Sequence, residues 1–397
     1  MSTYPLQDAV AIVGLGTTEY VRDGGHKTKG HLAVEACINA ITDAGLTAAD
    51  VDGLCGSNFQ ASPQYVQEGL GIPALTWWCS AWGPFTQLLS EAVHAVFAGA
   101  CSVAVVYQGQ VRTVRTSSSV DMTDPVRSVP DPGRSFDHHS DAQYYRPYGG
   151  RRGTYAGYMN RYMNEYHVPR ESFGLVAVNN RSHATANPHA VLKDPLSMND
   201  YLNSRFVRFP MCLNDIDYAI DGGDAVVVTT LERARDLKRP PVIVHAMAFG
   251  EHENPGRDAY RSVASVGQVI AMNTLWGRSA LNLNDVDLVY PYDGFTVITL
   301  RWLENFGFCD IGDAGNLLRD AWNDDKQIAE IDGRVLMNTH GGSLSDGATQ
   351  GAGHIREAVT QLRGDAGPRQ AATATTALLG IGGLFFNSVA MLMRADR

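Results

Sequence analysis

Apolar residues recur at helical spacing in two stretches of the chain, residues 32–44 and 266–280, and each stretch predicts an amphipathic helix. A turn and an Asp-x-Asp step follow each helix, and a hydrophobic strand follows the step. The two copies of the step are Asp50-Val51-Asp52 and Asp285-Val286-Asp287. An apolar run also precedes each copy, at residues 9–13 and 242–244. The pattern predicts two similar α/β halves, with a period too long for a solenoid and a functional site between the halves.

Further patterns predict the elements of the first half. Strands are expected at residues 53–57 and 102–107, where short apolar runs stand between turn residues. Residues 85–98 are apolar nearly all round, which predicts a helix buried in the centre of the molecule. Residues 75–84, which contain Trp77, Trp78 and Trp82, are expected to form the loop that opens this helix.

A long excursion follows at residues 108–153, which are rich in serine, proline and polar residues. Loops of this length inside a compact domain are usually lids or binding loops, so we expect a functional role here. Helices are predicted to resume at residues 154–165 and 170–186. Residues 221–223 predict a turn that leads into a buried strand.

The segment Lys238-Arg239-Pro240-Pro241 is the best candidate for a domain boundary, because two prolines end the preceding helix. We therefore expect an N-terminal half at residues 1–238, which includes a long loop region at about 108–170, and a C-terminal half at residues 239–397.

Composition narrows the classes of function. The 397 residues carry a formal net charge of -10 with no concentrated basic face, which argues against nucleic acid as the main partner. No run of about 18 apolar residues occurs, and the first residues lack the pattern of a signal peptide, so we expect a cytoplasmic protein without membrane insertion. The six cysteines form no C-x-x-C pair, so neither a zinc site nor a disulfide framework is indicated.

Cys79 is the first candidate for chemistry. It precedes the predicted buried helix, and the dipole at a helix N-terminus lowers the pKa of a thiol and favours a nucleophilic thiolate. The alternative interpretation is a structural cysteine among tryptophans, because apolar surroundings raise the pKa of a thiol.

The second candidate segment, residues 290–295, directly follows the strand of the second repeat. Tyr292 and Asp293 would lie at the carboxyl end of that strand, where open α/β sheets bind their ligands. Asp293 could equally cap the helix predicted at residues 296–306.

The third segment, residues 338–354, is rich in glycine, which lets backbone N–H groups approach a ligand closely. His340 stands in this loop and could act as an acid, a base or an oxyanion donor. His354 stands one turn into the next helix. A structural role is the alternative for each histidine.

These three segments, in this order on a duplicated α/β chain, resemble the thiolase superfamily over essentially the whole chain. Tyr292-Asp293-Gly294-Phe295 resembles the family's Asn-Glu-Ala-Phe or His-Asp-Cys-Phe box. Asn338-Thr339-His340-Gly341-Gly342 resembles the Asn-x-x-Gly-Gly loop, and Gly380-Ile381-Gly382-Gly383 resembles the C-terminal glycine turn. The resemblance is closest to the lipid-transfer-protein branch, which includes the sterol carrier protein thiolases and the steroid side-chain-cleaving aldolases. It implies an α/β, thiolase-like fold with duplicated βαβαβαββ halves in a layered αβαβα arrangement.

The chain departs from the thiolase pattern at the catalytic positions. Trp82 stands where the family has its nucleophilic cysteine, Ala348 where it has the catalytic histidine, and Leu378 where it has the second cysteine. The asparagine of the box has become Tyr292. A Claisen condensation needs a thiolate to carry the acyl group and a base to form the carbanion, so these losses argue against ordinary thiolase chemistry.

The steroid side-chain-cleaving aldolases resemble this pattern, and the resemblance implies retro-aldol cleavage of a bulky β-hydroxyacyl-CoA without a covalent intermediate. Tyr292, Asp293 and His340 would then transfer protons. These aldolases have a tyrosine where this chain has Ala348, so either another tyrosine such as Tyr260 replaces it or the substrate differs. Residues expected to bind substrate or CoA are Asn338, Gly341, Gly342, Trp82, Tyr260, His354 and Gly382.

The same resemblance implies no cofactor beyond the coenzyme A thioester that is the substrate. It also implies a homodimer and a small OB-fold or zinc-ribbon partner protein. Two alternatives remain: an acyltransferase or thiolase that uses Cys79 as a shifted nucleophile, and a non-catalytic thiolase-like subunit of an acyltransferase complex.

Overall fold

The computed structural model describes residues 4–22, 27–57, 61–112, 150–251, 262–384 and 387–396. Most of the predicted excursion, residues 113–149, lies outside the described residues, and so does Tyr260.

Twelve strands of the described chain form one hydrogen-bonded mixed sheet, and the two halves of this sheet have the same topology. The first half orders its strands β3-β2-β4-β7-β1, and the second orders its strands β12-β9-β13-β14-β8. If the strands of each half are counted along the chain, both orders read third, second, fourth, fifth, first. The pairings also match: the second strand is parallel to the third and fourth, and the fifth is antiparallel to the first and fourth. The duplication predicted from sequence is therefore present in the sheet.

The strands of the first half are β1 (Val10–Thr17), β2 (Gly53–Ser57), β3 (Trp77–Ala81), β4 (Val103–Val111) and β7 (Asp221–Thr230). Those of the second half are β8 (Val242–Gly250), β9 (Leu288–Pro291), β12 (Val335–Met337), β13 (Thr376–Ile381) and β14 (Ser388–Ala395). The halves meet where β1 pairs with β8. Beyond β12 lie the short strands β10 (Trp322–Asn323) and β11 (Ile328–Ile331), and β5 (Phe206–Arg208) and β6 (Met211–Cys212) form a separate hairpin.

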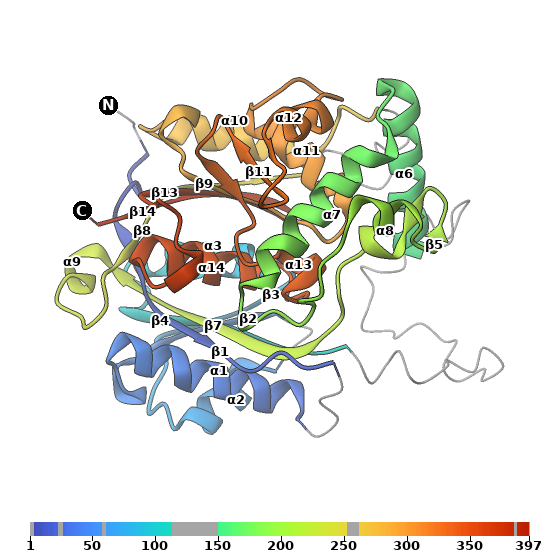
Figure 1. Cartoon of the computed structure of the whole chain (residues 1–397). Helices are drawn as coiled ribbons and strands as arrows, with labels where there is room; N and C mark the ends of the chain where they lie inside the picture. Colours follow the sequence, from blue (N-terminus) through green and yellow to red (C-terminus); the bar gives the residue numbers. More distant parts are fainter. Residues whose placement is uncertain are drawn as a thin grey trace.

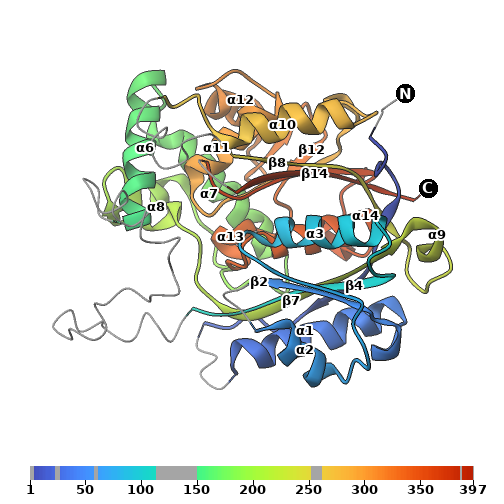
Figure 2. The ribbon, with the colours of Figure 1, turned by 180° about the vertical axis from the view of Figure 1, so that it is seen from behind.

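Helices and sheet portions alternate in five layers, as Figures 1 and 2 show. The central layer holds α3 (Phe85–Phe97) and α14 (Ala352–Arg363), and the outer layers hold α1 (Lys29–Ala44) with α2 (Pro63–Leu70) and α10 (Gly267–Arg278) with α11 (Thr296–Phe306) and α12 (Ala314–Asp320). Against one side pack α6 (Gly150–Tyr166), α7 (Arg170–Thr185) and α8 (Met198–Leu202). The expected αβαβα layering is confirmed.

The repeated Asp-x-Asp step does the same structural work in both halves. Its first aspartate closes a capping box: the backbone N–H of Thr47 donates to Asp50 at 2.9 Å, and that of Asn282 donates to Asp285 at 2.9 Å. Its second aspartate accepts hydrogen bonds from the backbone at the start of a neighbouring strand. Val103 donates to Asp52 at 2.8 Å, and Thr375 donates to Asp287 at 2.8 Å. The step therefore ties the start of the strand that follows it to the start of the neighbouring strand.

The helix α3 is buried in the centre, as its apolar sequence predicts. A single core cluster combines residues of α3, such as Leu88 and Leu89, with residues of α14, such as Ile355 and Val359. Both sheet portions contribute to this cluster, so the central helices bury apolar side chains on two sides.

Three predicted elements are wrong. Residues 108–111, expected at the start of the long excursion, extend strand β4. Residues 77–81, expected in a loop, form the edge strand β3, which pairs in parallel with β2. Its side chains alternate between half-buried and exposed, a period of two that the tryptophans obscured. Residues 221–223, expected in a turn, begin strand β7. Gly223 lies there because a Cβ would stand 2.4 Å from the carbonyl oxygen of Leu32 in α1.

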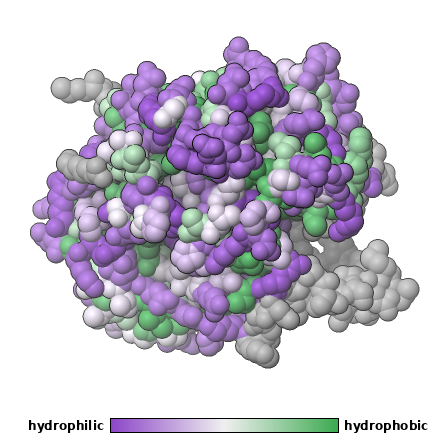
Figure 3. Space-filling model, in the orientation of Figure 1, coloured by the Kyte–Doolittle hydropathy of each residue, from purple (hydrophilic) through white to green (hydrophobic). Residues whose placement is uncertain are grey.

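Within the described ranges, no helix is long and apolar enough to cross a membrane. The face seen in Figure 3 is mostly hydrophilic, and its hydrophobic residues form small scattered groups.

Candidate active site

Asp293 is the centre of a buried polar cluster at the carboxyl end of β9. Its carboxylate accepts hydrogen bonds from the backbone N–H of Ser343 at 2.7 Å and of Leu344 at 3.0 Å, and from Nδ2 of Asn180 at 2.7 Å. His354 Nε2 lies 3.0 Å from Oδ1. The carboxylate therefore caps α13 (Gly342–Ser345), a helix 50 residues away in sequence, and not the helix that follows it directly.

Two glycines let the loop close over Asp293. A Cβ on Gly342 would stand 1.9 Å from Asp293 Oδ2, and one on Gly341 would stand 2.6 Å from Cβ of Ala184 in α7. Both glycines have positive φ angles, 105° for Gly341 and 62° for Gly342. No other residue type allows this approach without displacing the carboxylate.

Asn338 joins the ends of two neighbouring strands. It follows β12 with a left-handed φ of 49°, and its Nδ2 donates to the carbonyl of Pro291 at the end of β9, at 3.0 Å. Its Oδ1 is buried and has no hydrogen-bond partner among the residues that the structure describes. A buried unpaired acceptor is costly, which makes it available to a donor from a ligand or a water molecule.

His340 is buried beside His354, with ring centroids 4.8 Å apart and the rings nearly perpendicular. Burial, followed by the neighbouring charge of His354, holds the pKa of His340 well below its usual value, so the imidazole is neutral near pH 7. Its Nδ1 is buried, and no described residue forms a hydrogen bond with it. The arrangement provides a neutral imidazole next to the glycine-rich loop.

Tyr292 is half-buried between the main core clusters. Its backbone N–H donates to the carbonyl of Gly380 at 2.7 Å, which ties the box to the C-terminal glycine turn. Burial and then the charge of Asp217 raise the pKa of the Tyr292 hydroxyl above its usual value, so the hydroxyl is protonated and can donate.

Two further predicted residues, Gly382 and Trp82, lie in the segments between strands and helices. Gly382, with a φ of 102°, forms the turn between β13 and β14, where a Cβ would stand 1.9 Å from the carbonyl oxygen of Asn387. Trp82 lies half-buried in the turn between β3 and α3. The N-terminus of α3 reaches the glycine-rich loop through Phe85, whose N–H donates to the carbonyl of Gln350 at 3.0 Å.

Cys79 lies on the edge strand β3 and is half-buried. A hydrogen bond from the thiol of Cys55, its partner on β2, lowers the pKa of Cys79, while burial opposes this effect. Within the described part of the chain, no hydrogen bond or ion pair joins Cys79 to Asp293, His340 or His354.

The other positions of the thiolase catalytic groups hold buried apolar side chains. Ala348 is fully buried, and its N–H donates to the carbonyl of Tyr218 at 3.0 Å. Leu378 is fully buried within β13. Neither side chain carries a group that could act as a nucleophile or a base.

Sequence reasoning missed three contributors to the cluster. Asn180 is fully buried in α7 next to Asn179, and two adjacent amides inside an apolar helix were the available signal. Arg112 and Asp217 form an ion pair with N–O distances of 3.0 and 3.2 Å, and Asp217 N–H donates to the carbonyl of Gly294 at 3.1 Å. No sequence pattern pointed to this pair, because its members lie 105 residues apart.

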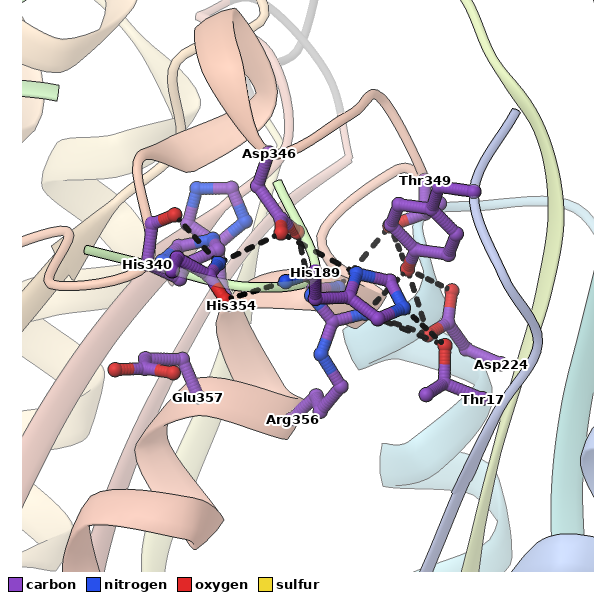
Figure 4. A network of polar contacts seen from close by, with 12 residues as sticks. Thr17, His189, Asp224, His340, Asp346, Thr349, His354, Arg356 and Glu357 are labelled. Carbon is purple, nitrogen blue, oxygen red and sulfur yellow. Dashed lines mark hydrogen bonds and ion pairs between the residues drawn. The ribbon is translucent and has the colours of Figure 1, made fainter. Parts of the chain in front are cut away.

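A second buried network holds the loop that follows α13, as Figure 4 shows. Arg356 of α14 pairs with Asp346 in this loop and, at 3.2 Å, with Asp224 of β7. Tyr20 also donates to Asp224, at 2.6 Å, and His189 Nδ1 lies 3.4 Å from Asp346. Burial alone would raise the pKa of Asp346, but Arg356 and the hydrogen bond with His189 hold it below its usual value. The network thus joins the glycine-rich loop to strands of the first half.

The chain is similar in sequence to known proteins over most of its length. A model of the family described as "Thiolase C-terminal domain-like" matches residues 260–395. A "Steroid side-chain-cleaving aldolase" of Thermomonospora curvata is 34% identical over 90% of this chain and 91% of that protein. A "17-hydroxy-3-oxo-4-pregnene-20-carboxyl-CoA lyase" of Mycobacterium tuberculosis is 33% identical over 90% of this chain and 92% of that protein.

Solved structures agree with the sequence relatives. A structure described as "Ltp2-ChsH2(DUF35) aldolase" superimposes with a TM-score of 0.87 at 32% identity, covering 99% of both chains. Human mitochondrial 3-ketoacyl-CoA thiolase superimposes with a TM-score of 0.69 at 16% identity, covering 99% of this chain and 100% of that chain, which shows the shared fold.

Proposed function

The chain belongs to the thiolase superfamily, in the branch of the steroid side-chain-cleaving aldolases, and from this we propose that it cleaves a carbon–carbon bond of a bulky β-hydroxyacyl-CoA by a retro-aldol reaction. One observation carries the proposal: within the described part of the chain, the polar cluster around Asp293 contains proton donors and acceptors but no cysteine. The positions of the family's second cysteine and histidine hold the buried Leu378 and Ala348.

The reaction breaks the bond between the α and β carbons. A base takes the proton of the β-hydroxyl, the β carbon becomes a ketone or aldehyde, and the electron pair passes to the α carbon as a thioester enolate. An acid then protonates the α carbon and releases the shortened acyl-CoA. No covalent bond to the protein forms, and the reaction consumes no other reactant.

We assign His340 as the base, because its imidazole is neutral and its Nδ1 has no partner. Tyr292 is the acid, because its hydroxyl is protonated at neutral pH. Asp293 positions the site: it orients His354 and holds α13, so its carboxylate acts through these groups. Nδ2 of Asn338, which also donates to Pro291, and the N–H group of Gly342 remain the proposed donors to the enolate oxygen. Gly341, whose N–H donates to the carbonyl of Asn338 at 2.8 Å, shapes the loop that presents them.

We propose a coenzyme A thioester with a steroid-like acyl group as the substrate, with no cofactor beyond it. The names of two relatives support this class, since one is a steroid side-chain-cleaving aldolase and the other a pregnene-carboxyl-CoA lyase. A small OB-fold partner protein is supported by the similar aldolase structure, which is described as containing ChsH2(DUF35) beside Ltp2. A homodimer is part of the same proposal.

A second candidate function is an acyltransferase or thiolase that uses Cys79. The hydrogen bond from Cys55 favours it, because this bond stabilises a thiolate at position 79. A non-catalytic subunit of an acyltransferase complex is the third possibility.

The test is to co-express the chain with an OB-fold partner and to follow cleavage of a steroid β-hydroxyacyl-CoA by mass spectrometry. We expect a ketone or aldehyde and a shortened acyl-CoA, in amounts unchanged by iodoacetamide or by Cys79→Ser. Cleavage of only a β-ketoacyl-CoA, dependent on free CoA and abolished by both treatments, would establish the thiolase instead. Activity that persists in the combined Tyr292→Phe, His340→Ala variant would contradict the assigned roles.

A further inference from the structure

The Arg112–Asp217 ion pair lies beside the Tyr292 turn, and none of the assigned roles explains it. The two side chains are 36% and 17% exposed, and they form two parallel hydrogen bonds at 3.0 and 3.2 Å. Their backbones are fixed independently. Arg112 N–H donates to Asp221 Oδ1 at 2.8 Å, and Asp217 N–H donates to the carbonyl of Gly294 at 3.1 Å. The pair therefore has a fixed place at the edge of the site.

The ring of Tyr292 folds back over the same residue, Gly294. A Cβ on Gly294 would stand 2.6 Å from the ring atom Cε1 and 3.0 Å from the hydroxyl oxygen, so glycine is what allows this ring position. Within the described part of the chain, no hydrogen bond of the Tyr292 hydroxyl is formed. Gly294 thus lies between the ring of Tyr292 and the backbone of Asp217, which places the ion pair on the same turn as the hydroxyl.

Arg112 and Asp217 act on this hydroxyl with opposite sign: the guanidinium favours loss of the proton, and the carboxylate opposes it. Other groups also face Tyr292, namely Asp293 on its own turn, Tyr155 on α6, and His354 on α14 at a ring distance of 5.7 Å. These other groups are constant when only the ion pair is changed.

We propose that Arg112 and Asp217 are positioning residues for Tyr292. The pair holds the Tyr292 ring over Gly294, and its two opposite charges balance each other at the hydroxyl, so that the hydroxyl keeps its proton until the enolate forms. This inference rests on the proposed function, in which Tyr292 is the acid. An unpaired guanidinium at this place would lower the pKa of the hydroxyl, so that it would lose its proton too easily. An unpaired carboxylate would raise the pKa and make the hydroxyl a poorer acid.

The test places 3,5-difluorotyrosine, a more acidic phenol, at position 292 of the full chain and follows its titration by fluorine NMR. We expect Asp217→Asn to lower the titration midpoint by about one pH unit, because the unpaired Arg112 charge remains. We expect Arg112→Met to raise the midpoint by about the same amount. The double variant should return close to the parent protein, because both charges are gone.

Two controls complete the design. Arg235→Met breaks another two-bond ion pair, with Asp396 beside α9 (Leu231–Ala234), and should leave the midpoint unchanged. Arg112→Lys keeps the charge but not the paired geometry, so it should change the fluorine shift of the protonated ring more than the midpoint. Shifts of the same sign in both single variants, or no shift beyond that of Arg235→Met, would overturn the inference.

The titration needs no turnover, so it separates two failures. If the midpoints move as expected but the chain cleaves no β-hydroxyacyl-CoA, the pair is real and the proposed function is wrong. If cleavage occurs and the midpoints do not move, the proposed function stands and this inference falls.

Discussion

The geometry of single residues decides how closely the glycine-rich loop approaches Asp293. Gly342 and Gly333 have nearly the same φ angle, 62° and 67°, but a Cβ on Gly342 would collide with the Asp293 carboxylate, whereas one on Gly333 would meet nothing within 4 Å. The two positions therefore separate the cost of a left-handed backbone from the cost of displacing the carboxylate.

Gly342→Ala should destabilise the protein by about 3 kcal/mol, because backbone strain adds to the loss of the α13 cap. Gly333→Ala carries only the strain and should cost about 1 kcal/mol. Urea unfolding of both variants measures the difference, and the aldolase assay should show a loss only for Gly342→Ala. Equal destabilisation of the two variants would mean that the carboxylate moves freely out of the way.

His183 predicts a dependence of stability on pH. Its burial, aided by Arg369, lowers its pKa from 6.5 to about 4. Between these values the unfolded chain binds more protons than the folded chain, so stability is retained above pH 6.5 and falls as the pH falls towards 4, by at most about 1.4 kcal/mol per pH unit.

Replacing His183 with glutamine should flatten this slope in urea unfolding series between pH 4 and 6.5. Thr185→Ala, on the same helix, changes no titratable group and should keep the slope. His340 contributes in the same direction, since its pKa is also lowered, so a residual slope should remain. An unchanged slope in His183→Gln would show that this histidine takes up its proton as readily in the folded protein as in the unfolded chain.

At the residue scale the sequence identified most of the cluster but not its connections. Tyr292, Asp293, Asn338, His340 and His354 were all candidates, and the structure brings them together. The bond from Asn180 to Asp293 spans 113 residues, and a local pattern contains no information about such a pairing. Whether the candidates act as assigned remains a prediction.

At the scale of elements, periodicity predicted helices well and failed at sheet edges. α1, α3 and α7 lie close to their predicted ranges, because each has a clear apolar face or core. β3 was missed because an edge strand leaves half of its side chains exposed and carries tryptophans that look like part of a site loop. Glycines at the start of β7 imitated a turn, although they serve close packing against α1.

The helix α14 connects several elements through Arg356, and the loss of this side chain should affect them together. Arg356→Met leaves the buried carboxylates Asp224 and Asp346 without their cation, so we expect a destabilisation of about 3–5 kcal/mol in urea unfolding. Arg235→Met, which removes an exposed ion pair with Asp396, should change stability little. A small effect at Arg356 would indicate that both carboxylates take up protons or reach solvent.

At the scale of the whole molecule, the site combines the second half of the repeat with elements inserted into the first half. The second half supplies Asp293, His340 and His354 from the ends of its strands and from α14, whereas α7 and the segment after β6 supply Asn180 and Asp217. The inserted elements between β4 and β7 thus complete a site that the repeated unit alone does not contain. The predicted boundary at residues 238–241 remains a prediction.

The edge strand β3 is the part of the sheet where we expect a second copy of the chain to bind. It pairs with β2 on one side, and within the described chain no strand covers its other side. Trp78 on this strand is 53% exposed. Unprotected edge strands with large apolar side chains tend to pair with another chain, so we expect β3 to lie in the interface of the proposed homodimer.

Trp78→Lys should therefore weaken the dimer, since a charge on an edge strand opposes pairing between chains. Light scattering of the eluted protein should then give a mass near the 43.0 kDa of one chain in place of twice that mass. Phe97→Lys, at the end of α3 and 44% exposed, is the matched control and should remain dimeric. A Trp78→Lys variant that dimerises as strongly as the control would place the interface elsewhere. A native protein that is monomeric would remove the interface. In either case the uncovered edge of β3 would be left for the small partner protein to cover.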